Sequence, residues 1–200
     1  MLNLLLASQN SGKIREMQAI LQGLPIQIIS PAELGIQIYV EENGKSYAEN
    51  AALKAKPYAK ASGLTTLADD SGLEGDALNG APGLFSARYA PDPNADDGDR
   101  RVYLLKNLAV HPRPWTARFF ATISIAQPNG EMHYTEGTCE GEIIPEERGD
   151  GGFGYDPIFY IPDKDCTMGE LDEDEKNRIS HRARALEKAK DFLLTLIERS

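Results

Sequence analysis

The chain has 200 residues, enough for a substantial hydrophobic core, so we expect a single domain over residues 1–200, compact or divided into two lobes. Its 31 acidic and 21 basic residues give a formal charge of −10, which disfavours nucleic-acid binding but allows a small phosphorylated ligand, especially one that carries a metal ion. No apolar run reaches membrane-spanning length, no basic leader of a signal peptide precedes the first apolar residues, and the two cysteines lack metal-site spacing, so we expect a cytoplasmic protein without a membrane partner.

The first half of the chain predicts an opening β-α-β unit. Residues 2–7 form a short apolar run that is typical of a buried strand. Asn10 or Ser11 can cap the next helix, which Gly23 and Pro25 end. We then expect a strand over residues 26–29, a polar loop over 41–45, an alanine-rich helix over 46–62, and a strand over 65–68 that ends at Asp69-Asp70-Ser71-Gly72.

The second half of the chain predicts a hairpin and a long terminal helix. Residues 80–98 are rich in Gly, Pro and Asp and predict a long loop. We expect a helix over residues 99–110, strands over 118–127 and 131–144 joined at Pro128-Asn129-Gly130, a bulge near Gly137, and a short strand over 158–161. Thr167 and Glu170 have capping-box spacing, and the last helix carries His181 and Arg182 in its first turn. The whole pattern predicts a mixed α/β fold.

Ser8-Gln9-Asn10-Ser11-Gly12-Lys13 lies where the first strand turns into a helix. A P-loop is excluded, because Ala7 replaces its first glycine and Ile14 replaces its magnesium-binding hydroxyl residue. The junction still directs backbone amides and a helix N-terminus toward an anion, so Asn10 and Lys13 can contact phosphates. The alternative is an ordinary capped helix with a solvated lysine.

Two aspartates follow the strand predicted over residues 65–68. Adjacent residues of an extended segment point to opposite sides, so one of Asp69 and Asp70 can enter a site while the other makes structural hydrogen bonds. The alternative is a turn that simply uses these polar residues. Asn50 and Lys54 share a helix face, from which Lys54 can reach a phosphate, or else remain solvated.

Gly151-Gly152-Phe153-Gly154-Tyr155-Asp156-Pro157 offers open backbone, an aromatic ring and a carboxylate, which together suit a nucleobase. The alternative is a glycine turn packed with Phe153 and Tyr155. A Rossmann site is excluded, because the proline at 157 disfavours a helix there. The stretch over residues 175–182 is cationic and suits phosphates and carbonyl oxygens.

Together these segments resemble the inosine triphosphate pyrophosphatase family, also called the dITP/XTP pyrophosphatases. The resemblance spans nearly the whole chain. It is carried by Ser8-x-Asn10-x-x-Lys13, Glu49-Asn50-Ala51-x-x-Lys54-Ala55, Ala68-Asp69-Asp70-Ser71-Gly72-Leu73, Gly80-Ala81-Pro82-Gly83, Ser86-Ala87-Arg88-Tyr89, Gly151-Gly152-Phe153-Gly154-Tyr155-Asp156-Pro157 and Glu175-Lys176-Asn177-x-Ile179-Ser180-His181-Arg182. The resemblance implies an elongated two-lobed α/β fold, with a mixed sheet flanked by helices, a cleft between the lobes, and a homodimer.

The resemblance also implies an activity. A purine nucleoside triphosphate such as ITP, dITP or XTP is hydrolysed, with Mg²⁺ as cofactor, to the monophosphate and pyrophosphate. Glu42 and Asp70 are the implied metal carboxylates, with Glu41 as the neighbouring alternative to Glu42, and Asp70 is also the general base. The implied substrate-binding residues are Ser8, Gln9, Asn10, Ser11, Gly12, Lys13, Lys54, Ser71, Phe153, Gly154, Tyr155, Asp156, Lys176, His181 and Arg182.

Two other functions stay open on the sequence. The first is a pyrophosphatase for other modified nucleotides, including pyrimidines. The second is a nucleotide sensor that binds without turnover, against which the pair of acidic residues Glu42 and Asp70 argues.

Overall fold

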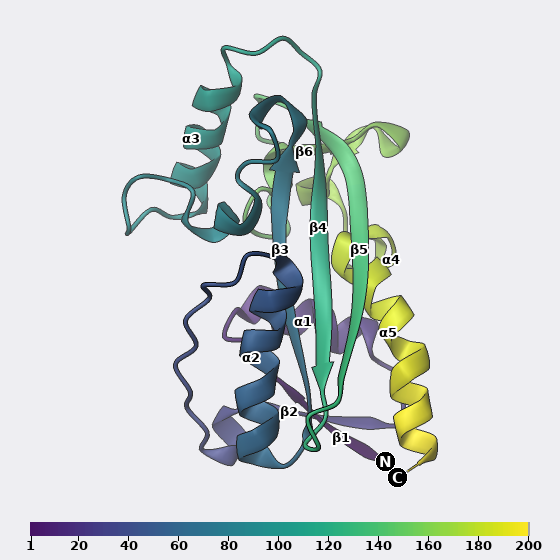
Figure 1. The fold of residues 1–200 in the computed structure, drawn as a ribbon. Coiled ribbons are helices and arrows are strands. Elements are labelled where there is room, and N and C mark those ends of the chain that lie inside the picture. The colour runs from purple at the N-terminus through teal and green to yellow at the C-terminus, as the bar shows by residue number, and fades with distance from the viewer. Residues whose placement is uncertain (200) are drawn as a thin grey trace. The chain divides into compact units, whose positions relative to one another are not determined.

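A seven-stranded mixed sheet organises the chain, in the order β2-β1-β3-β4-β5-β6-β7 (Figure 1). This computed structural model describes residues 1–199, and Ser200 lies outside the described residues. The strands are β1 (Leu2–Leu6), β2 (Ile26–Ile29), β3 (Thr65–Gly75), β4 (Trp115–Ala126), β5 (Met132–Ile143), β6 (Phe159–Ile161) and β7 (Cys166–Thr167). The helices are α1 (Ser11–Ile20), α2 (Tyr47–Ser62), α3 (Asp97–Leu108), α4 (Glu173–Ile179) and α5 (His181–Glu198). The predicted mixed α/β class is confirmed.

The opening β-α-β unit forms as its sequence pattern predicts. β1 pairs in parallel with β2 through Leu4 and Ile28, and with β3 through Leu6 and Leu67. Asn10 is the residue that caps α1, because its Oδ1 atom accepts a hydrogen bond from the backbone N of residue 13 at 3.0 Å.

The described chain divides into two compact units. The first comprises residues 1–70, 121–137 and 181–200, of which Ser200 is not described, and the second comprises residues 71–120 and 138–180. In the first unit, Leu4 and Leu6 pack with α1 and α5, while Leu5 packs on the opposite side with α2. The period-two alternation of β1 thus separates two apolar clusters, one on each side of the sheet.

The second unit has its own apolar core. Leu73 of β3, Leu104 and Leu108 of α3, and Phe119 of β4 all lie in it. Tyr155 also belongs to this cluster and is only 4 % exposed. The glycine segment over residues 151–154 is therefore attached to a packed core through its next residue.

The prediction that β3 ends at the acidic pair was wrong. The strand runs on to Gly75, and both aspartates are buried within it. Each carboxylate has at least one cationic partner, described below, and this pairing makes its burial in a strand possible.

Other boundaries shift by a few residues. α3 begins at Asp97, earlier than predicted, because Asp96 and Asp99 form a capping box. β5 runs unbroken through Gly137, where a Cβ atom would lie 2.2 Å from the carbonyl oxygen of His181, so a close approach of α5 accounts for that glycine. The capping box at Thr167 and Glu170 is confirmed, although it opens a 3₁₀ turn. None of the helices within residues 1–199 combines the length and apolar character needed to span a bilayer.

Candidate functional site

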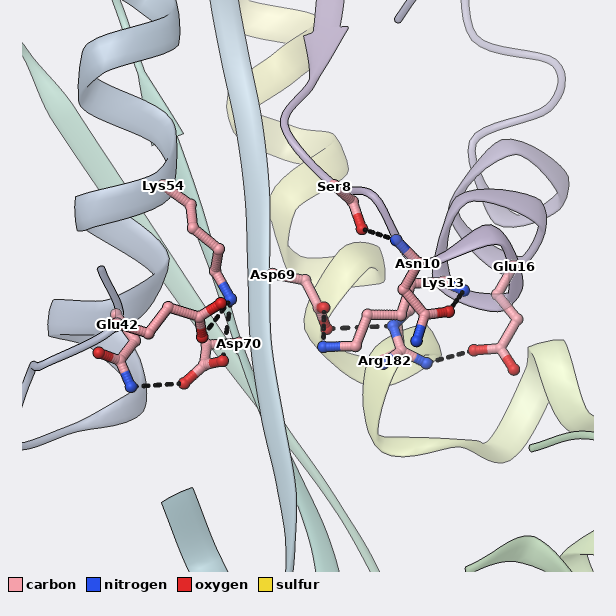
Figure 2. A network of polar contacts seen from close by, with 10 residues as sticks. Ser8, Asn10, Lys13, Glu16, Glu42, Lys54, Asp69, Asp70 and Arg182 are labelled. Atoms are coloured by element: carbon pink, nitrogen blue, oxygen red, sulfur yellow. Dashed lines mark hydrogen bonds and ion pairs between the residues drawn. The ribbon is translucent and has the colours of Figure 1, made fainter. Parts of the chain in front are cut away.

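Asp70 lies on the side of β3 that faces α2, where its carboxylate meets the ammonium group of Lys54 and the amide of Asn50 (Figure 2). Lys54 Nζ lies 2.9 Å from Asp70 Oδ1, and Asn50 Nδ2 donates to Asp70 Oδ2 at 3.2 Å. Asn50 and Lys54 are one helical turn apart in α2, so the expectation that they share a face is confirmed, and both point at the same carboxylate.

Glu42 joins this group from the loop that precedes α2. Its Oε2 atom lies 3.1 Å from Lys54 Nζ. The loop is fixed by the backbone N of Gly44, which donates to Asn50 Oδ1 at 2.8 Å. A Cβ atom at position 44 would lie 2.6 Å from that oxygen, so only glycine fits this approach. Glu41, the alternative to Glu42, is an exposed residue.

The protonation of the pair Asp70 and Lys54 is shifted by burial and by charge. Burial raises the pKa of Asp70, and the opposing attraction of Lys54 does not cancel that rise. Burial alone would lower the pKa of Lys54, but the attraction of Asp70, Asp69 and Glu42 outweighs burial and raises it. A carboxylate with a raised pKa next to a firmly charged ammonium is suited to accept a proton.

The carboxylates of Glu42 and Asp70 also fit a hard divalent cation. They already converge on one cationic nitrogen, that of Lys54. Among residues 1–199, no three His, Cys, Asp or Glu side chains gather into a metal site. Mg²⁺ commonly binds to one or two carboxylates and takes its other ligands from water and substrate phosphates, and this donor set is of that kind.

Asp69 lies on the opposite side of β3, toward α1 and α5 (Figure 2). Its Oδ1 atom lies 2.6 Å from Lys13 Nζ, and its Oδ2 atom accepts from Arg182 Nε at 3.1 Å. Arg182 Nη1 also bonds to Glu16 of α1. Arg182 is only 1 % exposed and the Asp69 side chain is fully buried, so this is an interior ion network.

Charge dominates burial for Asp69. Burial would raise its pKa, but Arg182, Lys13 and Lys54 outweigh burial and lower it strongly. Burial lowers the pKa of Lys13 despite the attraction of Asp69, and Arg182 and Lys54 add to that effect. For Arg182, the attraction of Asp69 and Glu16 overcomes burial and raises the pKa. The carboxylate of Asp69 is therefore held ionised by two cations.

The loop before α1 is mostly at the surface. Ser8 Oγ accepts from the backbone N of Asn10 at 3.3 Å (Figure 2). Gln9, Asn10 and Ser11 are exposed, whereas Gly12 is buried. This places polar groups and a helix N-terminus on a surface that an anion can reach.

Phe153, Asp156 and Lys176 form a third group, within the second unit. Asp156 Oδ2 accepts from the backbone N of Phe153 at 2.8 Å and lies 2.6 Å from Lys176 Nζ. The same nitrogen lies 4.8 Å from the centroid of the Phe153 ring. A Cβ atom at Gly152 would lie 2.1 Å from the Asp156 carboxylate, which explains that glycine. The structure gives Tyr155 an interior position, with its hydroxyl donating to the carbonyl oxygen of Ser86 at 2.8 Å.

The structure thus brings predicted site residues together in three local groups: Glu42, Lys54 and Asp70; Lys13 and Arg182, joined by Asp69, to which the sequence assigned no definite role; and Phe153, Asp156 and Lys176. Ser71 follows Asp70 in β3 and is half-buried. His181 is buried at the first position of α5.

Besides Asp69, several residues that contact predicted site residues were not themselves predicted to belong to the site. Glu16 lies one turn after Lys13 in α1, and that spacing was the available signal. Asn50 had been placed on the face of Lys54 without a role in the site. Asp97 and Arg101 both bond to the backbone of Gly154, and no local pattern marks them.

A family model and curated relatives both match nearly the whole chain. The model of the Ham1 family matches residues 4–192. A dITP/XTP pyrophosphatase of Desulforamulus reducens is 48 % identical over 193 residues, covering 96 % of each chain. A protein of the same name from Bacillus subtilis is 43 % identical over 189 residues, covering 94 % of this chain and 96 % of its own.

Two solved structures of Ham1 proteins also match nearly the whole chain. A HAM1 protein from Coxiella burnetii superposes with a TM-score of 0.88 at 46 % identity, covering 98 % of this chain and all of its own. The Staphylococcus aureus Ham1 protein gives a TM-score of 0.85 at 41 % identity, covering 96 % of this chain and 98 % of its own.

Proposed function

Since this chain belongs to the Ham1 family, we propose that it hydrolyses the non-standard purine nucleoside triphosphates dITP, ITP and XTP to the monophosphate and pyrophosphate. One observation carries the proposal. Glu42 and Asp70 converge on Lys54 Nζ, at 3.1 and 2.9 Å, in a chain whose relatives of similar length are named dITP/XTP pyrophosphatases.

Asp70 is the general base in this proposal. The water oxygen bonds to the α-phosphorus, the bond from that phosphorus to the bridging oxygen breaks, and the water proton passes to Asp70. Its raised pKa favours this transfer. Lys54 and Asn50 hold the two carboxylate oxygens in place. Mg²⁺, which Glu42 and Asp70 hold in this proposal, polarises the phosphate oxygens when bound.

The phosphates lie along the edge of β3 in this proposal. β1 pairs with β3 as far as Leu67, and the backbone N of Ala7 bonds to the carbonyl oxygen of Leu67 at 2.8 Å before the chain turns into α1. A triphosphate along the edge beyond Leu67 can meet Lys54 on one side of the strand and Lys13 on the other. Both cations neutralise the charge that develops on the departing pyrophosphate.

We further infer that the purine stacks on the ring of Phe153. Lys176 Nζ contacts this ring, and Asp156 accepts a hydrogen bond from the backbone N of Phe153. Donors that bond a 6-keto oxygen would be left unpaired against the amino group of adenine, which costs about 1–3 kcal/mol. Backbone amides, or the side chains of His181 and Arg182, are the proposed donors for this oxygen, and Arg182 also bonds to Asp69 and Glu16.

Two further properties belong to the proposal. We expect a cytoplasmic enzyme, because free nucleotides are its substrate and because neither Cys139 nor Cys166 forms a disulfide. We also expect a homodimer, since Phe85 and Val102 are 59 % and 65 % exposed on two packed elements, the 3₁₀ turn Gly83–Arg88 and α3. The mass in solution, measured by light scattering, tests the dimer.

The activity is tested with dITP, XTP, dGTP and dATP in the presence and absence of Mg²⁺, with pyrophosphate and orthophosphate measured separately. We expect pyrophosphate from dITP and XTP, little turnover of dGTP and dATP, and none without a divalent metal. Preferred turnover of a modified pyrimidine would shift the substrate class. Binding of dITP without any product would identify a sensor instead.

A further inference from the structure

Helix α3 holds the loop that carries Phe153 through the backbone of one residue. Asp97 Oδ2 accepts a hydrogen bond from the N of Gly154 at 2.8 Å. Arg101 Nη1 donates to the carbonyl oxygen of Gly154, also at 2.8 Å. Asp97 and Arg101 are four positions apart and share one face of α3, so both polar backbone groups of Gly154 are bound by a single helix face.

The position of Gly154 makes this double contact informative. Its N–H belongs to the peptide unit shared with Phe153, and its C=O belongs to the unit shared with Tyr155. Binding both groups therefore fixes the peptide planes on either side of Gly154, whose φ is +63°, a conformation that favours glycine. Tyr155 is anchored in the core, so the fixed plane on the other side sets where the Phe153 ring lies.

The two side chains are themselves braced. Arg101 makes a two-bond pair with Glu147, with distances of 2.8 and 2.9 Å. Arg100 Nη2 donates to Asp97 Oδ1 at 2.5 Å. Burial would raise the pKa of Asp97, but the bonds from Arg100 and from the Gly154 amide outweigh burial and lower it. Asp97 is therefore an ionised acceptor held in one orientation.

We propose that Asp97 and Arg101 are positioning residues for recognition of the base, and that they act through Gly154 on the ring of Phe153. This inference rests on the proposed function, because it assumes that Phe153 stacks on a nucleobase. A ring that is already held in its binding position loses less conformational freedom when the substrate arrives, so the helix face raises affinity for the base without touching it.

The test uses Asp97→Ala and Arg101→Met, which remove the acceptor and the donor. Matched controls are Asp76→Ala and Arg118→Met, because those two residues form a surface ion pair of 2.7 Å in the same unit, away from Gly154. Steady-state kinetics are measured with dITP and with ribose 5-triphosphate, which has a pentose and the three phosphates but no base. Thermal unfolding of each variant confirms that it is folded.

We expect each variant to raise the KM for dITP roughly tenfold, as suits the loss of one hydrogen bond to a charged group, with a much smaller change in kcat. Turnover of ribose 5-triphosphate and both controls should remain at the wild-type level. Equal losses on both substrates would overturn the proposal, because they would indicate general damage to the fold, and so would unchanged kinetics with dITP.

A double-mutant cycle with Phe153→Leu gives a second test. This test needs dITP alone, so it also decides the proposal when the protein does not hydrolyse ribose 5-triphosphate. Once the ring is gone, Arg101→Met should have little further effect on the KM for dITP. Full additivity of the two changes would overturn the proposal. If the wild-type protein itself fails to hydrolyse dITP, the proposed function fails first, and that outcome is distinct from either result in the variants.

Discussion

Asp69 and Asp70 are adjacent residues of one strand, yet the two sides of β3 treat their carboxylates in opposite ways (Figure 2). On the side of α1 and α5, Asp69 contacts two cations, Lys13 and Arg182, and its pKa is lowered. On the side of α2, Asp70 contacts one cation, Lys54, and an uncharged amide, and its pKa is raised.

The difference indicates that the two carboxylates have different roles. Two cations bonded to a buried carboxylate stabilise its ionised form, so the carboxylate has little affinity for a proton. A carboxylate with one cation and a second acid nearby retains affinity for a proton or a metal ion. Environments that move the pKa values of neighbouring acids apart separate structural from catalytic groups, and here the separation follows the two sides of a strand.

Asp70→Asn is expected to have the largest effect. The amide keeps the shape of the side chain but cannot accept the proton of water, so kcat for dITP should fall by about 10²–10⁴-fold. The free energy of unfolding should change little, because burial already disfavours the charge that the substitution removes. Single-turnover kinetics and urea unfolding measure the two quantities. A variant with near wild-type kcat would remove Asp70 from the role of base.

Asp69→Asn should show the reverse pattern. The change leaves Lys13 and Arg182 without the buried carboxylate that joins them. Removing one partner of a buried ion pair costs about 3–5 kcal/mol, so the loss should appear in the free energy of unfolding. The kcat of the folded fraction should fall far less than in Asp70→Asn. A variant as stable as the wild type but without turnover would reverse the assignment of the two aspartates.

The local parts of this arrangement could be predicted from the sequence, and the long-range parts could not. The cap at Asn10, the capping box of Thr167 and Glu170, and the shared face of Asn50 and Lys54 depend on spacings of three or four residues, and all are confirmed. That adjacent aspartates point to opposite sides follows from strand geometry alone.

The extension of β3 through its acidic pair depends on partners that a local pattern cannot reveal. Arg182, which helps to make the burial of Asp69 possible, is 113 residues away in the sequence. Without it, two consecutive aspartates, a serine and a glycine favour a turn. The contact between Arg101 and Gly154 spans 53 residues and joins a side chain to a backbone group, so neither residue type signals it.

Gly44→Ala should have the smallest effect. It tests whether the backbone contact of Gly44 with Asn50 holds Glu42 next to Lys54. A methyl group at position 44 would lie 2.6 Å from Asn50 Oδ1, so the loop must shift and move Glu42 away from Lys54. Strain from such overpacking is about 1–3 kcal/mol, shared between stability and position. We expect a higher Mg²⁺ concentration for half-maximal turnover of dITP, with the ion network of Asp69 intact.

Asn43→Ala is the matched control, because Asn43 is the exposed neighbour of Gly44 in the same loop. It should leave the Mg²⁺ requirement unchanged. Gly44→Ala measured at saturating Mg²⁺ should recover most of the wild-type kcat, since Asp70 and Lys54 keep their own contact at 2.9 Å. An unchanged Mg²⁺ requirement in Gly44→Ala would mean that Glu42 does not depend on this loop anchor. An equal rise in both variants would assign the effect to the loop as a whole, because it is the backbone of Gly44 that bonds to Asn50 Oδ1.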